Sequence, residues 1–239
     1  MLRHIKNEDM GHSNLHWLDS YHHFSFSDYY NPENIQFGVL RVLNDDLVGP
    51  GTGFDTHHHS NMEIISYVVD GELTHADSMG NRHQLSRGQV QYMSAGTGVL
   101  HSEHNYGHEI LRFLQIWILP NGKDYAPQYG DYPFSWDDRI DTWMPIASGD
   151  SDPKFPIQIH ADVHVYASFL PRGDSLSFQV GPGRQAYLVQ IEGECLANNT
   201  IEMVKRDALE IVEEDLALEA NTSAHLLIIE MAKADKAPE

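Results

Sequence analysis

Short apolar segments separated by turn-forming residues dominate positions 37 to 119, and they constrain the fold more than any other feature. Runs rich in β-branched and aromatic residues occupy 37–43, 63–69, 89–93 and 111–119. Residues typical of turns lie between them: Asn44-Asp45-Asp46, Asp70-Gly71, Met79-Gly80-Asn81 and Arg87-Gly88. Amphipathic patterns of helical length are absent from this stretch. Many short strands at close spacing predict an all-β protein made of antiparallel sandwiches or barrels.

The second half of the sequence repeats parts of the first. Residues 187–194 read Tyr-Leu-Val-Gln-Ile-Glu-Gly-Glu and resemble residues 65–72, Ile-Ser-Tyr-Val-Val-Asp-Gly-Glu, and residues 205–211 resemble 86–92 in the same way. Self-similarity over about 120 positions predicts two copies of one β-barrel packed together. Residues 121–156 contain five prolines and are expected to form a long connection. We therefore expect one domain at residues 1–130 and a second at 131–239.

Charge and cysteine content exclude several classes of protein. The chain has 239 residues, with 35 acidic against 15 basic side chains and a formal net charge of −20, which disfavours binding to a phosphate backbone. Cys195 is the single cysteine, so an intrachain disulfide and a thiolate-rich metal site are excluded. No apolar run reaches the roughly 20 residues of a membrane helix, and the first residues do not read as a secretory signal. We expect a cytoplasmic monomer without membrane or nucleic-acid contacts.

Two pairs of metal-binding side chains are the sharpest functional signal. His57 and His59 form one pair, and His101 and Glu103 form the other. Alternate residues of a strand share a face, so His57 and His59 should point one way and His58 the other. If the two strands face each other, three imidazoles and one carboxylate converge, a donor set that suits a divalent transition metal better than Mg²⁺ or Ca²⁺.

The second half lacks this chemistry. Where the first copy has its His-x-His pair, the second has Gly181-Pro182-Gly183-Arg184-Gln185, and no His-x-Glu pair follows Leu209. We therefore expect one metal site, in the N-terminal copy, with the C-terminal copy lacking ligands.

The spacing Gly51-x5-His57-x-His59-x3-Glu63 resembles the first signature of the cupin superfamily, and three further segments resemble the pirin family within it. These are residues 11–30, with His16-Trp17-Leu18-Asp19-Ser20 and Phe24-Ser25-Phe26; residues 40–54, with Asn44-Asp45-Asp46 and Pro50-Gly51-x-Gly53-Phe54; and residues 93–103, with Met93-x-Ala95-Gly96-x-Gly98 and His101-Ser102-Glu103. The resemblance implies a bicupin fold whose metal ligands are His57, His59, His101 and Glu103. It also implies one divalent transition metal, with Fe(II) as the first expectation, and N and O ligands also accept Ni, Cu, Mn or Zn.

Other residues near the motif have alternative roles. In many cupins the glutamate at the position of Glu63 is a ligand, but Glu103 repeats the geometry of the first pair, so we expect Glu63 to orient an imidazole instead. His75 and His104 are weaker candidates, expected at the cavity rim or in solvent. Phe54 and Met93 are expected to line the substrate cavity. Isolated histidines are expected to be ordinary residues, namely His4, His83, His108, His160 and His225.

The resemblance implies quercetin 2,3-dioxygenase activity, in which O₂ opens the flavonol ring with loss of carbon monoxide. Glu103 is the expected catalytic residue, because a carboxylate at the metal can take the proton of the substrate hydroxyl. Pirins usually have proline and a basic residue at the positions of His58 and Ser60, so this sequence departs from the pattern where substrate or partner preference could change. The alternative is a metal- or redox-dependent regulator that binds a protein partner.

Overall fold

The computed structural model describes residues 1–233, and almost all regular structure in them is β-strand. The strands fall into two compact units, each with one seven-stranded and one four-stranded sheet. One unit contains residues 11–134 and 159–161, and the other contains residues 1–10, 135–158 and the described chain from 162 onwards. The expected all-β, bicupin architecture is confirmed.

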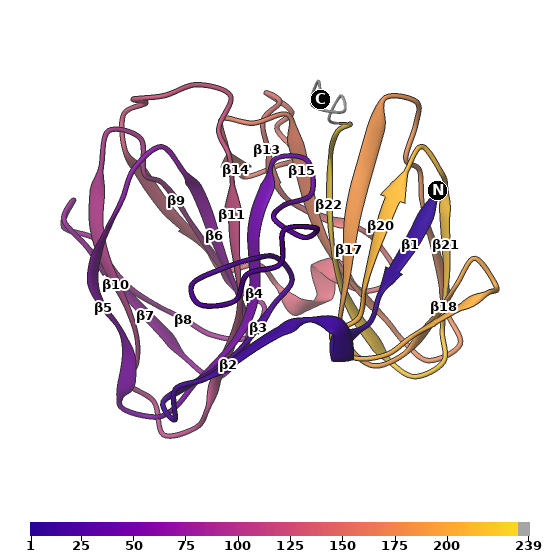
Figure 1. Ribbon diagram of the computed structural model, residues 1–239, viewed down its shortest axis with the longest axis horizontal. Helices are drawn as coiled ribbons and strands as arrows, with labels where there is room; N and C mark the ends of the chain where they lie inside the picture. The colour runs from indigo at the N-terminus through magenta and orange to yellow at the C-terminus, as the bar shows by residue number, and fades with distance from the viewer. Residues whose placement is uncertain (234–239) are drawn as a thin grey trace. The chain divides into compact units, whose positions relative to one another are not determined.

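The unit of residues 11–134 carries the candidate site. Its large sheet has the order β12-β9-β6-β11-β4-β3-β2, and its small sheet has the order β5-β10-β7-β8 (Figure 1). The strands are β2 (Gly11–Asn14), β3 (Leu18–His22), β4 (Leu40–Val48), β5 (Thr52–His59), β6 (Glu63–Asp70), β7 (Leu73–Asp77), β8 (Arg82–Leu85), β9 (Val90–Ser94), β10 (Val99–Asn105), β11 (Leu111–Ile118) and β12 (Gln128–Tyr132).

The second unit repeats this plan. Its large sheet has the order β1-β20-β17-β22-β15-β13-β14, and its small sheet has the order β16-β21-β18-β19. The strands are β1 (Leu2–Ile5), β13 (Met144–Ser148), β14 (Ile157–Gln158), β15 (Val163–Leu170), β16 (Ser175–Phe178), β17 (Arg184–Glu192), β18 (Cys195–Ala197), β19 (Ile201–Met203), β20 (Ala208–Val212), β21 (Leu216–Ala220) and β22 (Ala224–Ala232). Two 3₁₀ turns, η1 (Asn7–Asp9) and η2 (Trp136–Arg139), also belong to it.

The sequence repeat corresponds to equivalent strands in the two large sheets. β6 lies between β9 and β11, and its sequence counterpart β17 lies between β20 and β22. At the edge, β12 pairs with β9 in one unit, whereas β1 pairs with β20 in the other. The first ten residues therefore belong to the C-terminal unit, which differs from the division at residue 130 expected from the sequence.

Two sequence predictions about local structure are corrected. Residues Asn44 to Asp46, predicted as a turn, lie inside β4 and pair with both β3 and β11. Residues 121–156, predicted as a linker, contain β12, η2 and β13. Both errors have one cause, since pairing with strands distant in sequence outweighs local turn propensity.

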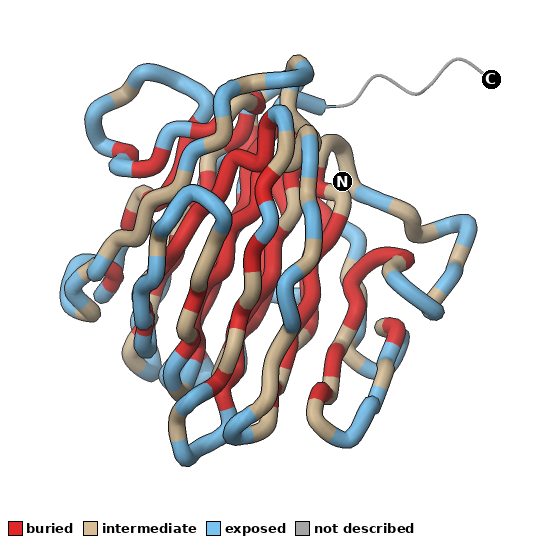
Figure 2. Tube along the Cα trace, turned by 90° about the vertical axis from the view of Figure 1, so that its left-hand side faces the viewer, coloured by how far each residue is buried: buried red, intermediate tan, exposed pale blue. Residues whose placement is uncertain are grey.

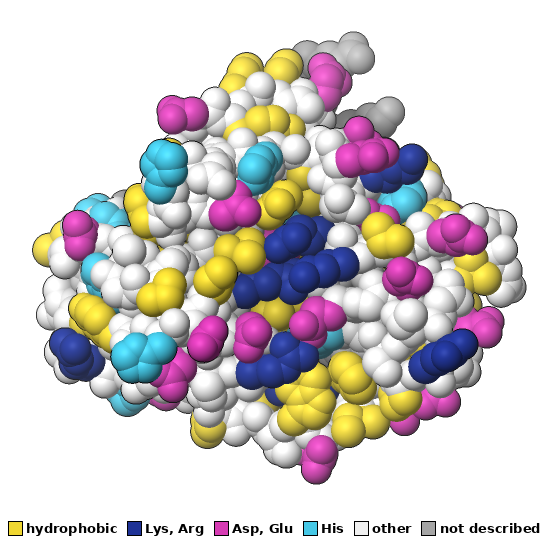
Figure 3. All heavy atoms as spheres, turned by 90° about the horizontal axis from the view of Figure 1, so that it is seen from below, with side chains coloured by type: hydrophobic (Ala, Val, Ile, Leu, Met, Phe, Trp, Pro, Cys, Tyr) yellow, Lys and Arg dark blue, Asp and Glu magenta, His cyan; other side chains and the backbone are white. Residues whose placement is uncertain are grey.

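Buried residues run along the inner strands, and exposed residues gather in the connections (Figure 2). In the unit that carries the site, Val48, Val68, Leu73, Leu111 and Phe113 form one apolar cluster with their neighbours. Acidic side chains are spread among other residues over the face shown in Figure 3. Within residues 1–233, no helix is long and apolar enough to cross a membrane.

Candidate metal centre

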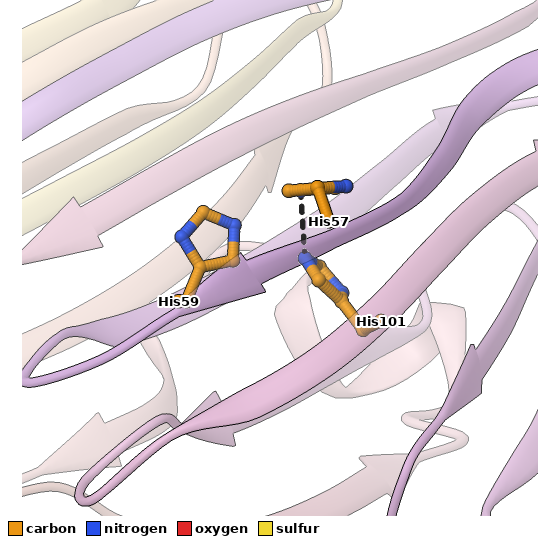
Figure 4. A group of neighbouring side chains, drawn as sticks. All are labelled: His57, His59 and His101. Atoms are coloured by element: carbon orange, nitrogen blue, oxygen red, sulfur yellow. Dashed lines mark hydrogen bonds between the residues drawn. The ribbon is translucent and has the colours of Figure 1, made fainter.

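Three imidazoles converge where β5 and β10 pair antiparallel, with His57 opposite His101 and His59 opposite Val99. The Nε2 atoms of His57 and His101 are 3.1 Å apart, and the His59 ring centroid lies 4.8 Å from that of His57 and 4.9 Å from that of His101 (Figure 4). His58 is exposed and lies on the other face of β5. The predicted alternation of this strand is confirmed.

The backbone of β5 orients one of these rings. The register between β5 and β10 shifts between Phe54 and His57, so that Glu103 lies opposite Phe54 while His101 lies opposite His57. In the shifted segment the Nδ1–H of His57 donates to the carbonyl oxygen of Asp55 at 2.7 Å. Because Nδ1 carries the proton, Nε2 keeps its lone pair and is the atom that faces His101.

The electrostatics of the cluster fit a cation. Burial, together with the neighbouring imidazoles, lowers the pKa of His59 to about 4 and that of His101 to about 3. Both rings are therefore neutral at physiological pH and offer lone pairs. One nitrogen atom from each of His57, His59 and His101 lies within 4.8 Å of the others, as a metal site requires. Neutral imidazoles this close match the N-donor set of a divalent transition metal.

Glu103 lies beside this cluster and is 2% exposed. Its Oε1 accepts hydrogen bonds from Ser66 Oγ (2.8 Å) and Gln91 Nε2 (2.6 Å), and its Oε2 accepts one from Gln115 Nε2 (2.7 Å). These three neutral donors fix the carboxylate and stabilise its charge. Glu103 also forms a second group of ligand atoms, with His75 and His101, within the same 4.8 Å. The four expected ligands thus fall into two overlapping groups that share His101.

The donors to Glu103 belong to a polar row that crosses the large sheet. His22, Asn44, Gln115, Ser66 and Gln91 lie directly opposite one another on β3, β4, β11, β6 and β9. Buried polar side chains are costly unless they are hydrogen-bonded. Three members of the row meet that requirement by binding Glu103.

His75 is not at the rim or in solvent, as the sequence led us to expect. It is 1% exposed, because β7 pairs with β10 and places His75 opposite Glu103. Its Nε2 lies 3.1 Å from Asp77 Oδ2, and its ring stacks on Tyr129 at a centroid distance of 4.4 Å. His104, in contrast, lines the cavity and stacks on Tyr106, which agrees with a rim position.

Glu63 contacts an imidazole that the sequence did not single out. Its Oε1 accepts hydrogen bonds from Ser94 Oγ at 2.8 Å and from the Nδ1 of His160 at 3.1 Å, and the His160 ring stacks on Tyr125. Within the described part of the chain, Glu63 belongs to no group of metal-binding side chains. His160 lies 97 positions away in sequence and in no recognisable motif, so no local signal could have identified it.

A cavity of about 720 Å³ opens beside the histidines. Phe54 lines it as predicted, but Met93 does not, since it packs against Ile64 and Val99 in a separate apolar cluster. Aromatic rings form much of the wall, with Trp17 edge-on to Phe54 at 5.2 Å and Trp117 edge-on to His59 at 4.8 Å. The lining residues are Trp17, Phe26, Asn44, Asp46, Gly51, Thr52, Gly53, Phe54, Asp55, His57, His59, Glu103, His104, Gln115 and Trp117.

Comparison with known proteins identifies the family of this chain. Residues 4–118 match the family described as pirin, and residues 145–231 match the family described as quercetinase C-terminal cupin domain. A "Pirin-like protein" of Caulobacter vibrioides is 39% identical over 94% of this chain and 97% of its own length. The chain belongs to the pirin family. A relative from Pseudomonas aeruginosa, named "Putative quercetin 2,3-dioxygenase", is 42% identical over 93% of this chain and 96% of its own length.

Solved structures of pirins share the whole fold. The crystal structure of YhhW from Escherichia coli superposes with a TM-score of 0.92 at 33% identity, covering 99% of this chain and 100% of that one. A second structure of that protein, described as bacterial pirin in complex with nickel(II), has a TM-score of 0.91, also at 33% identity, and covers 98% of this chain and 100% of its own. The family resemblance drawn from the sequence is confirmed.

Proposed function

We propose that this pirin is a metal-dependent dioxygenase that opens the central ring of flavonols such as quercetin, with release of carbon monoxide. The observation that carries the proposal is the cluster of His57, His59 and His101 beside an aromatic cavity of about 720 Å³. A cavity of this size with a few converging polar groups suits a small aromatic molecule. A relative named quercetin 2,3-dioxygenase, from Escherichia coli K12, is 35% identical over 95% of this chain and 96% of its own length.

In this proposal His57, His59, His101 and Glu103 hold one divalent transition metal. Fe(II) is our first expectation, and nickel is a second candidate, since a structure of the related pirin YhhW is described as a complex with nickel(II). When bound, the metal supplies Lewis acidity toward an ionised substrate oxygen and a centre for reaction with O₂. The low pKa values of His59 and His101 keep both rings ready to bind it at neutral pH.

Glu103 is the residue we assign to proton transfer. Its Oε1 already accepts two hydrogen bonds, whereas its Oε2 accepts one, from Gln115, so Oε2 has capacity for one more. Glu103 lines the cavity, so a substrate hydroxyl can reach Oε2 and transfer its proton there when this oxygen is not bound to the metal. In the overall reaction, both atoms of O₂ enter the organic product and one ring carbon leaves, with its oxygen, as carbon monoxide.

The aromatic wall gives the site its preference for planar molecules. Trp17, Phe54, Phe26 and Trp117 surround the space next to the polar groups. Edge and face contacts with such rings favour flat aromatic substrates.

An oxygen-electrode assay tests the proposal, because metal-loaded protein should consume O₂ and release carbon monoxide when quercetin is added. His57→Ala should abolish turnover and metal binding. His58→Ala is the matched control, because His58 is next to His57 in sequence but lies on the opposite, exposed face of β5. This variant should keep both turnover and metal binding. Absence of O₂ consumption by the metal-loaded wild type would contradict the proposal. If a protein partner then bound only to the metal-loaded protein, the alternative function, a metal-dependent regulator, would be favoured.

A further inference from the structure

Two polar side chains in the middle of β4 have no role in holding Glu103. Asn44 and Asp46 are 2% and 3% exposed, lie on the same face of the strand and both line the cavity. They interrupt a face of β4 whose other residues are apolar, at positions where the local sequence favours a turn. Burying an amide and a carboxyl group in a strand costs free energy, so their position calls for an explanation.

The protein satisfies only one end of each side chain. Asn44 Oδ1 lies 3.0 Å from the Nδ1 of His22, and Ser20 donates a hydrogen bond to Asp46 Oδ1. The other ends are Asn44 Nδ2 and Asp46 Oδ2. In residues 1–233 neither atom has a hydrogen bond to protein, and neither is fully enclosed. A donor and an acceptor on the cavity wall therefore remain available to a ligand.

Within residues 1–233, no Lys, Arg or His side chain pairs with Asp46. The neighbouring Asp45 is paired with Arg112, and Asp45 and Glu103 act on Asp46 as negative charges. Burial is the main cause that raises the pKa of Asp46 to about 7, and the hydrogen bond from Ser20 opposes it. Near neutral pH both forms are populated, so this carboxyl group can accept a hydrogen bond or donate one.

The register places Asp46 beyond Glu103 as seen from the histidines. Along β11, Trp117 contacts His59, Gln115 binds Glu103, and Phe113 lies directly opposite Asp46. Two residues of a strand span roughly 7 Å, so the layer of Asp46 lies about that distance beyond the layer of Glu103. A substituted benzene ring attached to the reacting ring bridges a gap of this length.

We propose that Asn44 and Asp46 form a hydroxyl-binding subsite that selects aromatic substrates carrying a hydroxyl group on a ring remote from the reacting one. The inference rests on the proposed dioxygenase function and adds a substrate class. Flavonols with several hydroxyl groups should be preferred to flavonols that carry only the reacting hydroxyl group. A ligand without the remote hydroxyl leaves the two buried groups unpaired, which is how polar pockets reject such analogues.

Calorimetric binding to metal-loaded protein without O₂ tests the subsite separately from turnover. The probes are quercetin and 3-hydroxyflavone, which has only the reacting hydroxyl group. The wild type should bind quercetin at least tenfold more tightly, and Asp46→Ala should remove most of this preference by weakening quercetin alone. Asn44→Ala is the second variant and should act in the same direction. Asp19→Asn, on the neighbouring β3 and outside the cavity lining, should retain the preference.

The results of these binding measurements distinguish the hydroxyl-binding subsite from the dioxygenase function. An unchanged preference in the folded Asp46 and Asn44 variants, or equal binding of both probes by the wild type, overturns the subsite. Selective binding that depends on Asp46, in protein that consumes no O₂ with quercetin, supports the subsite and overturns the dioxygenase function.

Discussion

Replacing Asp46 with asparagine should change how the stability of the metal-free protein depends on pH. The folded protein raises the pKa of Asp46 from 3.8 to about 7, chiefly because burial disfavours the charged carboxylate. The groups that act on it are Ser20, which donates a hydrogen bond, and the carboxylates of Asp45 and Glu103. Asparagine has nearly the same size and keeps no titrating proton.

The direction and size of this change follow from the difference in proton binding between the folded and the unfolded protein. Between pH 4 and 7 the folded protein holds the Asp46 proton while the unfolded chain releases it, so the free energy of unfolding falls as pH rises. A shift of about 3 pKa units corresponds to about 4 kcal/mol. The stability of Asp46→Asn minus that of the wild type should therefore increase by about 4 kcal/mol from pH 4 to pH 8.

Urea unfolding with a chelator present, followed by circular dichroism at pH 4, 6 and 8, measures this difference. Taking the difference between variant and wild type cancels the titration of the groups that the two proteins share. Gln84→Ala, at an exposed position of β8, removes no titrating group; it serves as the control and should give a difference that does not depend on pH. A stability difference between Asp46→Asn and the wild type that is independent of pH would refute the assignment of a buried, proton-holding carboxyl group.

Three further predictions concern the metal centre and the packing of β5 against β10. His101→Ala should lower the metal content from about one ion per chain to near zero by elemental analysis, since His101 belongs to both groups of ligand atoms. Gln115→Ala should weaken metal binding about 10- to 100-fold in a competition titration by freeing Glu103 Oε2, whereas the exposed Gln84→Ala should have no effect. Gly53→Ala should destabilise the protein by about 1–3 kcal/mol in urea unfolding, because its Cβ would lie 2.4 Å from the backbone oxygen of Glu103. Unchanged metal content in His101→Ala, unchanged metal affinity in Gln115→Ala or an unchanged unfolding midpoint in Gly53→Ala would contradict the corresponding prediction.

Local sequence was sufficient to predict β6, β9 and β11 and the residues that share one face of the site. Alternation along β5 places His57 and His59 together and His58 opposite, whatever the rest of the chain does. The repeat between residues 65–72 and 187–194 likewise predicts two similar units, because each copy carries its own strand pattern. These properties depend on neighbours within one segment, which is why sequence alone determines them.

Tertiary structure decided the surroundings of that face. The sequence predicts His75 at the cavity rim or in solvent, yet pairing of β7 with β10 buries it beside Glu103. His160 looks like an ordinary histidine in the sequence, yet it binds Glu63 from 97 positions away. Asn44 and Asp46 read as a turn but lie in a strand, because β3 and β11 pair with β4 on both sides. Pairing between distant strands sets which polar groups become buried together, and no local pattern encodes it.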